Sequence, residues 1–411
     1  MDRSLRLPFL GWATGALFFF YAWVLRVSPS VMIDELMRDF NVSSTLLGNL
    51  SAFYFYGYAG MQIPVGLMLD RFGPRRLMTL AALVCAAGCV LSAVSTSFWS
   101  VSAGRFLIGA SAAFSLVGSM AVAGQWFPPH RFALLSGLAT FMGMAGGVLG
   151  QAPVRLGVEA FGWRQVMLVL AVGGVLIAIA AWATVRDRQR RAGGQGHILR
   201  GLLQVARQPQ TWLISVVGLG AGAPLLGFAA LWGVPYLGVT HGLDKTTAAA
   251  VTSMMFVGWG LAAPVNGWLS DRLGSRKKLL IAGLLVSAMC ISTIVYVPGL
   301  PVWVIAGLCL LGGIGGSVQT IGFAAAREHN PVHLSGTTIG FVNCLMTGSG
   351  ALFQTLIGWL LDIVWDGQMV AGARFYDATA YRFALSAIVA GPVVGFLCAL
   401  AIRETHCKQV G

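Results

Sequence analysis

Two arginines lie inside long apolar stretches, Arg26 within residues 9–33 and Arg105 within residues 99–126. On insertion scales a central arginine costs about 2.5–3.5 kcal/mol, so each needs a polar cavity or a partner of opposite charge. None of the 14 acidic residues falls in the middle of an apolar stretch. The missing counter-charge is therefore expected to be an anionic ligand, which arginine binds well. The alternative is that both side chains extend to lipid headgroups.

Aromatic side chains in the second predicted span suit a small organic solute. Tyr54 and Tyr58 are four residues apart and share one helix face, and each offers an apolar ring with a hydroxyl. By register, Trp232 and Trp259 are the second-half counterparts of Arg26 and Tyr58. The alternative for the tyrosines is ordinary packing or an interfacial belt.

Polar residues repeat at helical spacing in two further stretches. The two sets are Thr140, Met144, Gly147 and Gln151, and Asn343, Thr347, Gly350 and Gln354. Each set is predicted to occupy one helix face. Such a face either lines a cavity, which makes Gln151, Asn343 and Gln354 substrate contacts, or joins neighbouring membrane helices.

Several kinds of chemistry are not expected. Glycine-rich runs such as 143–147 and 312–316 lie inside apolar stretches and lack a Walker lysine, so they predict close helix packing and no ATP site. The seven cysteines form no pattern typical of a disulfide framework or a zinc site. We expect no enzyme, no cofactor and no metal.

The composition requires a lipid environment. The chain is 57% hydrophobic and 10% charged, with many stretches long enough to cross a bilayer. Twelve spans are predicted: 9–33, 46–69, 77–96, 99–126, 133–156, 163–185, 211–237, 246–270, 279–298, 302–325, 334–362 and 381–403. The predicted fold is an all-α membrane protein with six helices in each half.

The net charge of +13 indicates orientation, not nucleic-acid binding, because the basic residues lie in loops. Most of them fall in segments on the side of the N-terminus, which the positive-inside rule places in the cytoplasm. Both termini are therefore expected inside, and the short loops suggest a bacterial inner membrane. The outer loops are expected to hold Arg38, Arg155, Arg164, Lys245, Arg374 and Arg382.

One loop sequence occurs twice, at 66–76 and 267–277. Its first copy supplies Gly66, Asp70, Arg71, Gly73 and Arg75, and its second Gly267, Asp271, Arg272, Gly274 and Arg276. A repeat near half the chain length indicates two similar halves. We expect bundles at 1–185 and 211–411, joined by a basic cytoplasmic linker at 186–210.

Twelve spans in two halves, with this loop sequence in both and Arg105 four residues before Gly109, resemble the major facilitator superfamily. The resemblance implies alternating access around a central site formed by the first, fourth, seventh and tenth spans. It also implies that Asp70 braces the cytoplasmic end of the eleventh span in one state, with Arg71 and Arg75 in the same gate. Asp271 and Arg272 would be looser counterparts.

Arg26 followed by Ser28, together with Arg105, is similar to the anion:cation symporters, in which such arginines bind a carboxylate. Leu25 and Ala112 stand where that group usually has acids, so its mode of proton coupling is not expected here. Nitrate carriers use an arginine in the second and eighth spans, and this chain has none in either, which argues against nitrate.

The sequence thus predicts a secondary or facilitative transporter of a small organic anion or amino-acid-like metabolite. Coupling to a proton or another cation, or uniport, stays open. An efflux carrier for drug-like compounds or a siderophore is the alternative, and a sensor would want an output domain that the short loops do not offer. The expected partners are the substrate and the bilayer, for a monomer that binds no nucleic acid.

Overall fold

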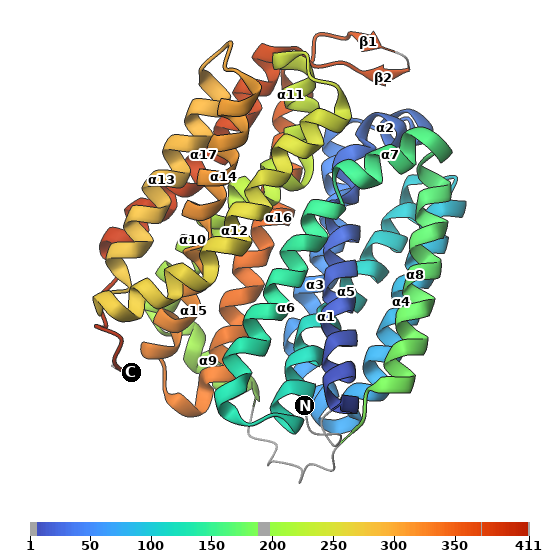
Figure 1. The fold of residues 1–411 in the computed structure, drawn as a ribbon. Helices are drawn as coiled ribbons and strands as arrows, with labels where there is room; N and C mark the ends of the chain where they lie inside the picture. Colours follow the sequence, from blue (N-terminus) through green and yellow to red (C-terminus); the bar gives the residue numbers. More distant parts are fainter. Residues whose placement is uncertain (1–5, 188–197, 371, 410–411) are drawn as a thin grey trace. The chain divides into compact units, whose positions relative to one another are not determined.

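The computed structural model describes residues 6–187, 198–370 and 372–409, and these are almost entirely helical (Figure 1). The described residues divide into two compact units, one of residues 6–32 and 53–187 and the other of residues 33–52, 198–370 and 372–409. The all-α prediction is confirmed.

The first unit contains α1, the part of α3 from Phe53 onward, and α4 to α8. The bounds are α1 Arg6–Val27, η2 Ser28–Val31, α3 Ser44–Phe72, α4 Pro74–Val94, α5 Phe98–Trp126, α6 Pro129–Leu149, α7 Ala152–Phe161 and α8 Trp163–Thr184. A core of side chains from α1, α4, α5, α6 and α8 holds the unit together, with Trp12, Met78 and Leu135 among its largest members.

The second unit contains α2, the first turns of α3, and the rest of the chain. The bounds are α2 Ile33–Phe40, α9 Ile198–Ala206, α10 Pro209–Ala223, η3 Pro224–Trp232, α11 Gly233–His241, α12 Lys245–Leu273, α13 Lys277–Tyr296, α14 Val302–Gly316, α15 Gln319–Glu328, η4 Val332–Leu334, α16 Ser335–Ile363, β1 Met369–Val370, β2 Ala373–Arg374 and α17 Ala378–Ala401. The two short strands pair antiparallel.

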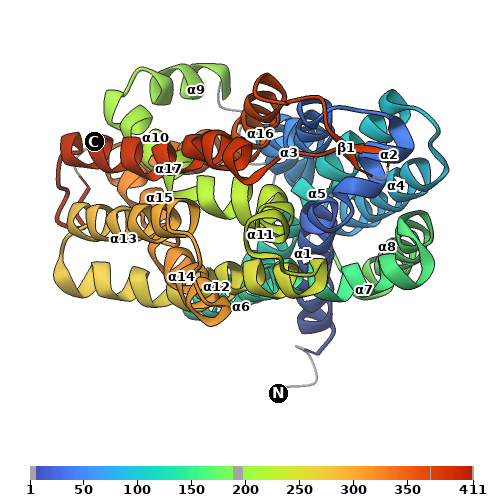
Figure 2. The same ribbon diagram turned by 90° about the horizontal axis from the view of Figure 1, so that it is seen from above.

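The two units repeat one packing scheme. In the first, α4 lies against α5 and α8; in the second, α13 lies against α14 and α17 (Figure 2). The repeat inferred from the loop sequence therefore extends to helix packing.

Eleven stretches of the described residues are helical, long and apolar enough to cross a membrane, and they match eleven of the predicted spans. The remaining prediction, 46–69, corresponds to α3, which has 29 residues.

Three predicted spans are not uniform α-helices. The fifth is interrupted between α6 and α7, just before Pro153, which cannot donate to the preceding turn. The seventh contains the π-helix η3, which begins at Pro224. The tenth breaks after four glycines at 312–316, which weaken a helix.

The interruption corrects one prediction about the polar face of the fifth span. Gln151 caps α7 with φ −100° and ψ −107°, so it does not continue the helical face of Thr140, Met144 and Gly147. The corresponding residues of the eleventh span, Asn343 to Gln354, do lie in one uninterrupted helix, α16.

Candidate functional site

Arg26 lies in the last turn of α1, buried and surrounded by aromatic rings. Its Cζ is 4.1 Å from the ring centre of Trp23, 4.8 Å from that of Tyr58 and 5.1 Å from that of Tyr54. Ring faces attract a cation, so this surrounding suits a buried guanidinium. The structure thus brings together three of the predicted site residues and adds Trp23, one helical turn before Arg26.

The two tyrosines are held by a close approach of α3 to α5. Their rings stack with centres 6.1 Å apart and planes 13° from parallel. A side-chain carbon on Gly109 would collide with the carbonyl oxygen of Tyr54, and one on Gly57 with that of Phe106. The paired glycines let the two backbones touch, which places the tyrosines beside the arginine-bearing α5.

Arg105 is also buried, and two of its nitrogens hold the end of α1. Its Nη1 donates to the carbonyl of Leu25 at 2.6 Å and its Nη2 to that of Arg26 at 3.4 Å. A cation at a helix C-terminus, where carbonyls lack helical partners, is stabilising. Arg105 therefore fixes the turn that carries Arg26.

Tyr54 lies next to both cations, because its ring centre is also 5.2 Å from the Cζ of Arg105. Among the described residues, neither arginine has a carboxylate within ion-pair distance. The Nε of each is buried without a hydrogen-bond partner. The site is thus positive and has free donor capacity.

Arg155, expected in an outer loop, is a third buried arginine. It lies in α7. Its Nη1 donates to the carbonyl of Val31 at 2.8 Å, and its Nε forms an ion pair with Glu159 at 2.8 Å. That expectation was wrong because α7 continues the fifth span beyond the break. The spacing of Arg155 and Glu159, one helical turn, was the available signal.

The buried glutamines join helices within their own units. Gln151 accepts from Ser30 at 3.0 Å, and Gln354 donates to the carbonyl of Leu226 at 2.7 Å. Both side chains are fully buried. Their contacts favour the helix-joining alternative over cavity lining.

The second unit replaces the charged residues with apolar or aromatic ones. Trp232 is buried and donates to the carbonyl of Gln354 at 3.0 Å. Trp259 packs against the backbone at Gly316. Asn343 is half-buried and accepts from Thr347 at 3.4 Å.

The glycine contact between α3 and α5 recurs between α12 and α14. Side-chain carbons on Gly258 and Gly313 would collide with the carbonyls of Leu310 and Met255. Aligning Gly313 with Gly109 places Cys309 where the first unit has Arg105. At this position the repeated scaffold therefore carries an arginine in the first unit and a cysteine in the second.

The loop sequence is held in both units by an acid that sequence reasoning missed. In the first, Asp187 accepts from the backbone N–H of Arg75 at 2.9 Å, beside Gly73 at φ +80°. In the second, Glu404 accepts from the backbone N–H groups of Arg276 at 3.0 Å and Lys277 at 3.1 Å. The signal was a dipeptide, Arg186-Asp187 and Arg403-Glu404, directly after the sixth and twelfth spans.

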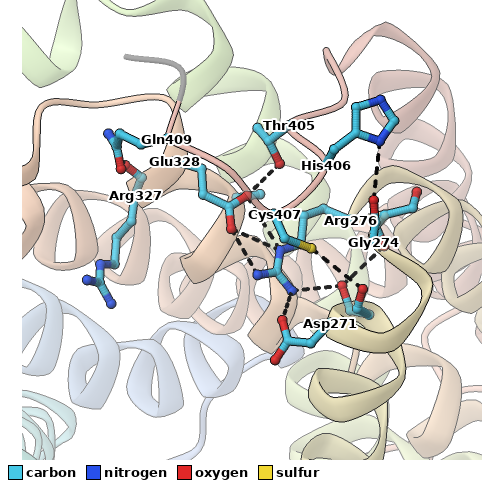
Figure 3. Close-up of polar contacts among 12 residues, drawn as sticks. Asp271, Gly274, Arg276, Arg327, Glu328, Thr405, His406, Cys407 and Gln409 are labelled. Atoms are coloured by element: carbon cyan, nitrogen blue, oxygen red, sulfur yellow. Dashed lines mark hydrogen bonds and ion pairs between the residues drawn. The ribbon is translucent and has the colours of Figure 1, made fainter.

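Arg276 is the centre of the loop network in the second unit (Figure 3). Its Nη1 donates to Asp271 at 2.6 Å and its Nη2 to Glu328 at 2.9 Å. Burial opposes ionisation, but these hydrogen bonds raise the pKa of Arg276 above its usual value. Asp271 thus belongs to this network, and Glu328 is an acid that the sequence reasoning did not select.

The other motif residues are less constrained. Arg71 and Arg272 are exposed, with Cζ 5.1 Å from the ring centre of Phe72 and 5.2 Å from that of Trp268. Gly66 and Gly267 have open space around them, and Gly274 has φ +61°. The side chain of Asp70 lies outside the described part of the structure.

Comparisons with known proteins agree on the family. The model described as Major Facilitator Superfamily matches residues 12–355 and, in a second match, residues 225–406. A protein of Cupriavidus necator named "Probable sulfoacetate transporter SauU" is 24% identical over 63% of this chain and 64% of its own length. "Probable nitrate/nitrite transporter NarK2" of Mycobacterium tuberculosis is 27% identical over 88% of this chain and 90% of its own.

The fold also matches a solved structure. A bacterial homologue of the human lysosomal transporter Spinster superposes with a TM-score of 0.78, at 16% identity, over 95% of this chain and 96% of that one. The family model covers nearly the whole chain, and the helix count and internal repeat agree with it. The chain belongs to the major facilitator superfamily of membrane transporters.

Proposed function

We propose that this transporter carries a small organic anion and that Arg26 binds its anionic group. The observation that supports this most directly is a buried guanidinium with aromatic neighbours and no described carboxylate partner. Burying an unpaired charge is costly, and a bound anion removes that cost.

The aromatic surroundings favour an oxyanion ligand. Trp23, Tyr54 and Tyr58 place their rings against the cation, and the Nε of Arg26 is buried without a hydrogen-bond partner. A guanidinium is a planar fork of donors that can give an oxyanion two parallel hydrogen bonds. Carboxylate and sulfonate groups match that fork. A short organic chain would lie against the rings, as suits a metabolite anion.

Arg105 has a different role in this proposal. Its terminal nitrogens are engaged by carbonyls of α1, so it positions Arg26 and adds positive potential, with its Nε available. The two arginines thus act as one binding residue and one positioning residue.

The relatives support the substrate class at a coarse level. One relative is named as a probable sulfoacetate transporter and another as a probable nitrate/nitrite transporter. Sulfoacetate, nitrate and nitrite are all oxyanions. The absence of arginine from the second and eighth spans still disfavours nitrate for this chain. We propose alternating access as the transport mode, with Asp70, Arg71 and Arg75 in the cytoplasmic gate.

A binding screen tests the proposal. The purified full chain is heated with sulfoacetate, small dicarboxylates, nitrate and an uncharged polyol, each over a range of concentrations. An anion at 100 times its dissociation constant stabilises the protein by about 2.7 kcal/mol. We expect a shift with an organic anion that Arg26→Gln abolishes and that Arg131→Gln, an exposed control at the start of α6, retains.

Uptake into proteoliposomes then separates transport from binding. The anion that stabilises the protein should be taken up by the native chain and not by the Arg26 variant. Selective uptake of a neutral or cationic compound, or native flux in Arg26→Gln, would refute the proposal.

A further inference from the structure

Asp362, in the last turn of α16, receives hydrogen bonds from two other segments of the second unit, the start of α3 and the stretch before α17. The backbone N–H groups of Ser44 and Thr45 donate to it at 3.3 and 2.9 Å, and the Thr45 hydroxyl donates at 2.5 Å. Tyr376 donates at 2.6 Å and Arg374 at 3.3 Å. The carboxylate thus caps the N-terminus of α3, where unpaired N–H groups favour negative charge.

The helix backbones touch beside this cap. A side-chain carbon on Gly48 would collide with the carbonyl of Gln354, and one on Gly358 with the carbonyl of Ser44. These paired glycines bring the first turns of α3 against α16, which is why residues 33–52 belong to the second unit. Ion pairs also join α2 to the start of α12, because the Nζ of Lys245 lies 2.7 Å from Asp34 and 3.6 Å from Glu35.

The rest of α3 belongs to the first unit and carries the tyrosines beside Arg26. The helix is continuous from Ser44 to Phe72, while the unit boundary falls after Ala52. At 1.5 Å per residue, Tyr54 lies only about 14 Å along the helix from Thr45. Whatever holds or releases the start of α3 therefore acts on the helix that builds the arginine site.

We propose that Asp362 is a gating residue for transport. It holds α3 against α16 in one state of the transport cycle, and its bonds to Ser44 and Thr45 break in the other state. The contact suits this task because the cap is made of hydrogen bonds, which can break and re-form. The bonds from Tyr376 and Arg374 keep the carboxylate partnered after α3 leaves.

The hydrogen bonds of Asp362 to α3 can be weakened by a substitution of equal size. Asparagine at 362 keeps the size of the side chain but removes the charge and one acceptor oxygen, so it weakens the α3 cap selectively. Burial and the hydrogen bond to Asp362 raise the pKa of Tyr376 to about 12, so this donor stays protonated at neutral pH. The inference does not depend on which solute is carried.

Hydrogen–deuterium exchange of the full chain in nanodiscs tests the proposal without a substrate. We expect Asp362→Asn to raise the exchange of amides in residues 44–50 at least tenfold. In the same variant, amides at the other end of α3, in residues 66–76, should exchange more slowly, because the molecule moves toward its other state. Asp366→Asn, an exposed acid four residues on, should change neither.

Opposite changes at the two ends distinguish a gate from a merely structural cap. Faster exchange at both ends, or at 44–50 alone, would assign Asp362 to local stability and overturn the gate. No change at 44–50 would show that the carboxylate does not hold α3. If Asp362→Asn does not fold, Thr45→Val removes only the hydroxyl donor and must give the same opposite changes in weaker form.

Discussion

At the scale of single residues, the structure assigns different energetic roles to the two arginines of the site. Arg105 makes two hydrogen bonds to carbonyls of α1, whereas Arg26 lies among aromatic rings and no described acid pairs with it. We expect Arg26→Gln to leave the anion-free protein as stable as the native one, or more stable by up to about 3 kcal/mol, since an unpaired charge is removed. Arg105→Gln should destabilise it by about 1–3 kcal/mol.

Thermal unfolding of both variants without ligand checks this difference. Arg105→Lys is the matched control, because it keeps the charge near the carbonyls of Leu25 and Arg26 and should recover part of the stability. Equal destabilisation by Arg26→Gln and Arg105→Gln would mean that both side chains are primarily structural.

The sequence was enough to select these residues as a candidate site, but it was not enough to predict which atoms they contact. Arg26, Tyr54 and Tyr58 were selected from type and spacing, and the structure groups them. The hydrogen bonds of Arg105 to α1 could not be foreseen, because they depend on how closely α5 approaches α1. Gln151 was misassigned to a continuous helix face because one proline, Pro153, decides where α6 ends.

At the scale of helices, close packing at glycine sets the position of the site. An alanine at Gly109 would place its side-chain carbon against the carbonyl of Tyr54, so α3 and α5 would have to separate. We expect Gly109→Ala to cost about 1–3 kcal/mol of stability and to weaken anion binding. Gly137→Ala, in α6 with open space around it, should be neutral or slightly stabilising.

Unfolding and anion titration of the two glycine variants measure this effect. Gly313→Ala makes the equivalent collision in the second unit and should cost similar stability without disturbing the rings around Arg26. Native stability in Gly109→Ala would contradict the packing argument.

The caps of α4 and α13 give a pH dependence. Burial disfavours the ionised form, but hydrogen bonds from Ser275 and the backbone hold the pKa of Glu404 below its ordinary value. A depressed folded-state pKa contributes stability above the pKa of the unfolded carboxyl, near 4.3, and loses it as the pH falls further. Glu404→Gln should therefore cost about 0.5–2 kcal/mol at pH 7 and less near pH 4, measured by denaturation at both values.

At the scale of the whole molecule, the long apolar stretches predicted nearly every long helix, because lipid requires long continuous apolar segments. The loop repeat predicted two related halves, and the glycine contacts repeat with it. The division of the chain at α3 was not foreseeable from sequence. It depends on the glycine contacts and the Asp362 cap that join the start of α3 to α16, which is about 300 residues away along the chain.

Orientation in the membrane is the last property that the charge pattern predicts for the molecule as a whole. The basic residues concentrate at the loop sequences, at the linker and beside the C-terminus, so we expect all of these in the cytoplasm. A fluorescent protein fused after residue 411 should fluoresce in a bacterial host, and alkaline phosphatase at the same position should be inactive. Fusions in the loop at 364–377, which joins α16 to α17, should give the reverse result. An active phosphatase at the C-terminus would invert the assignment, and Asp362 would then hold the cytoplasmic end of α3.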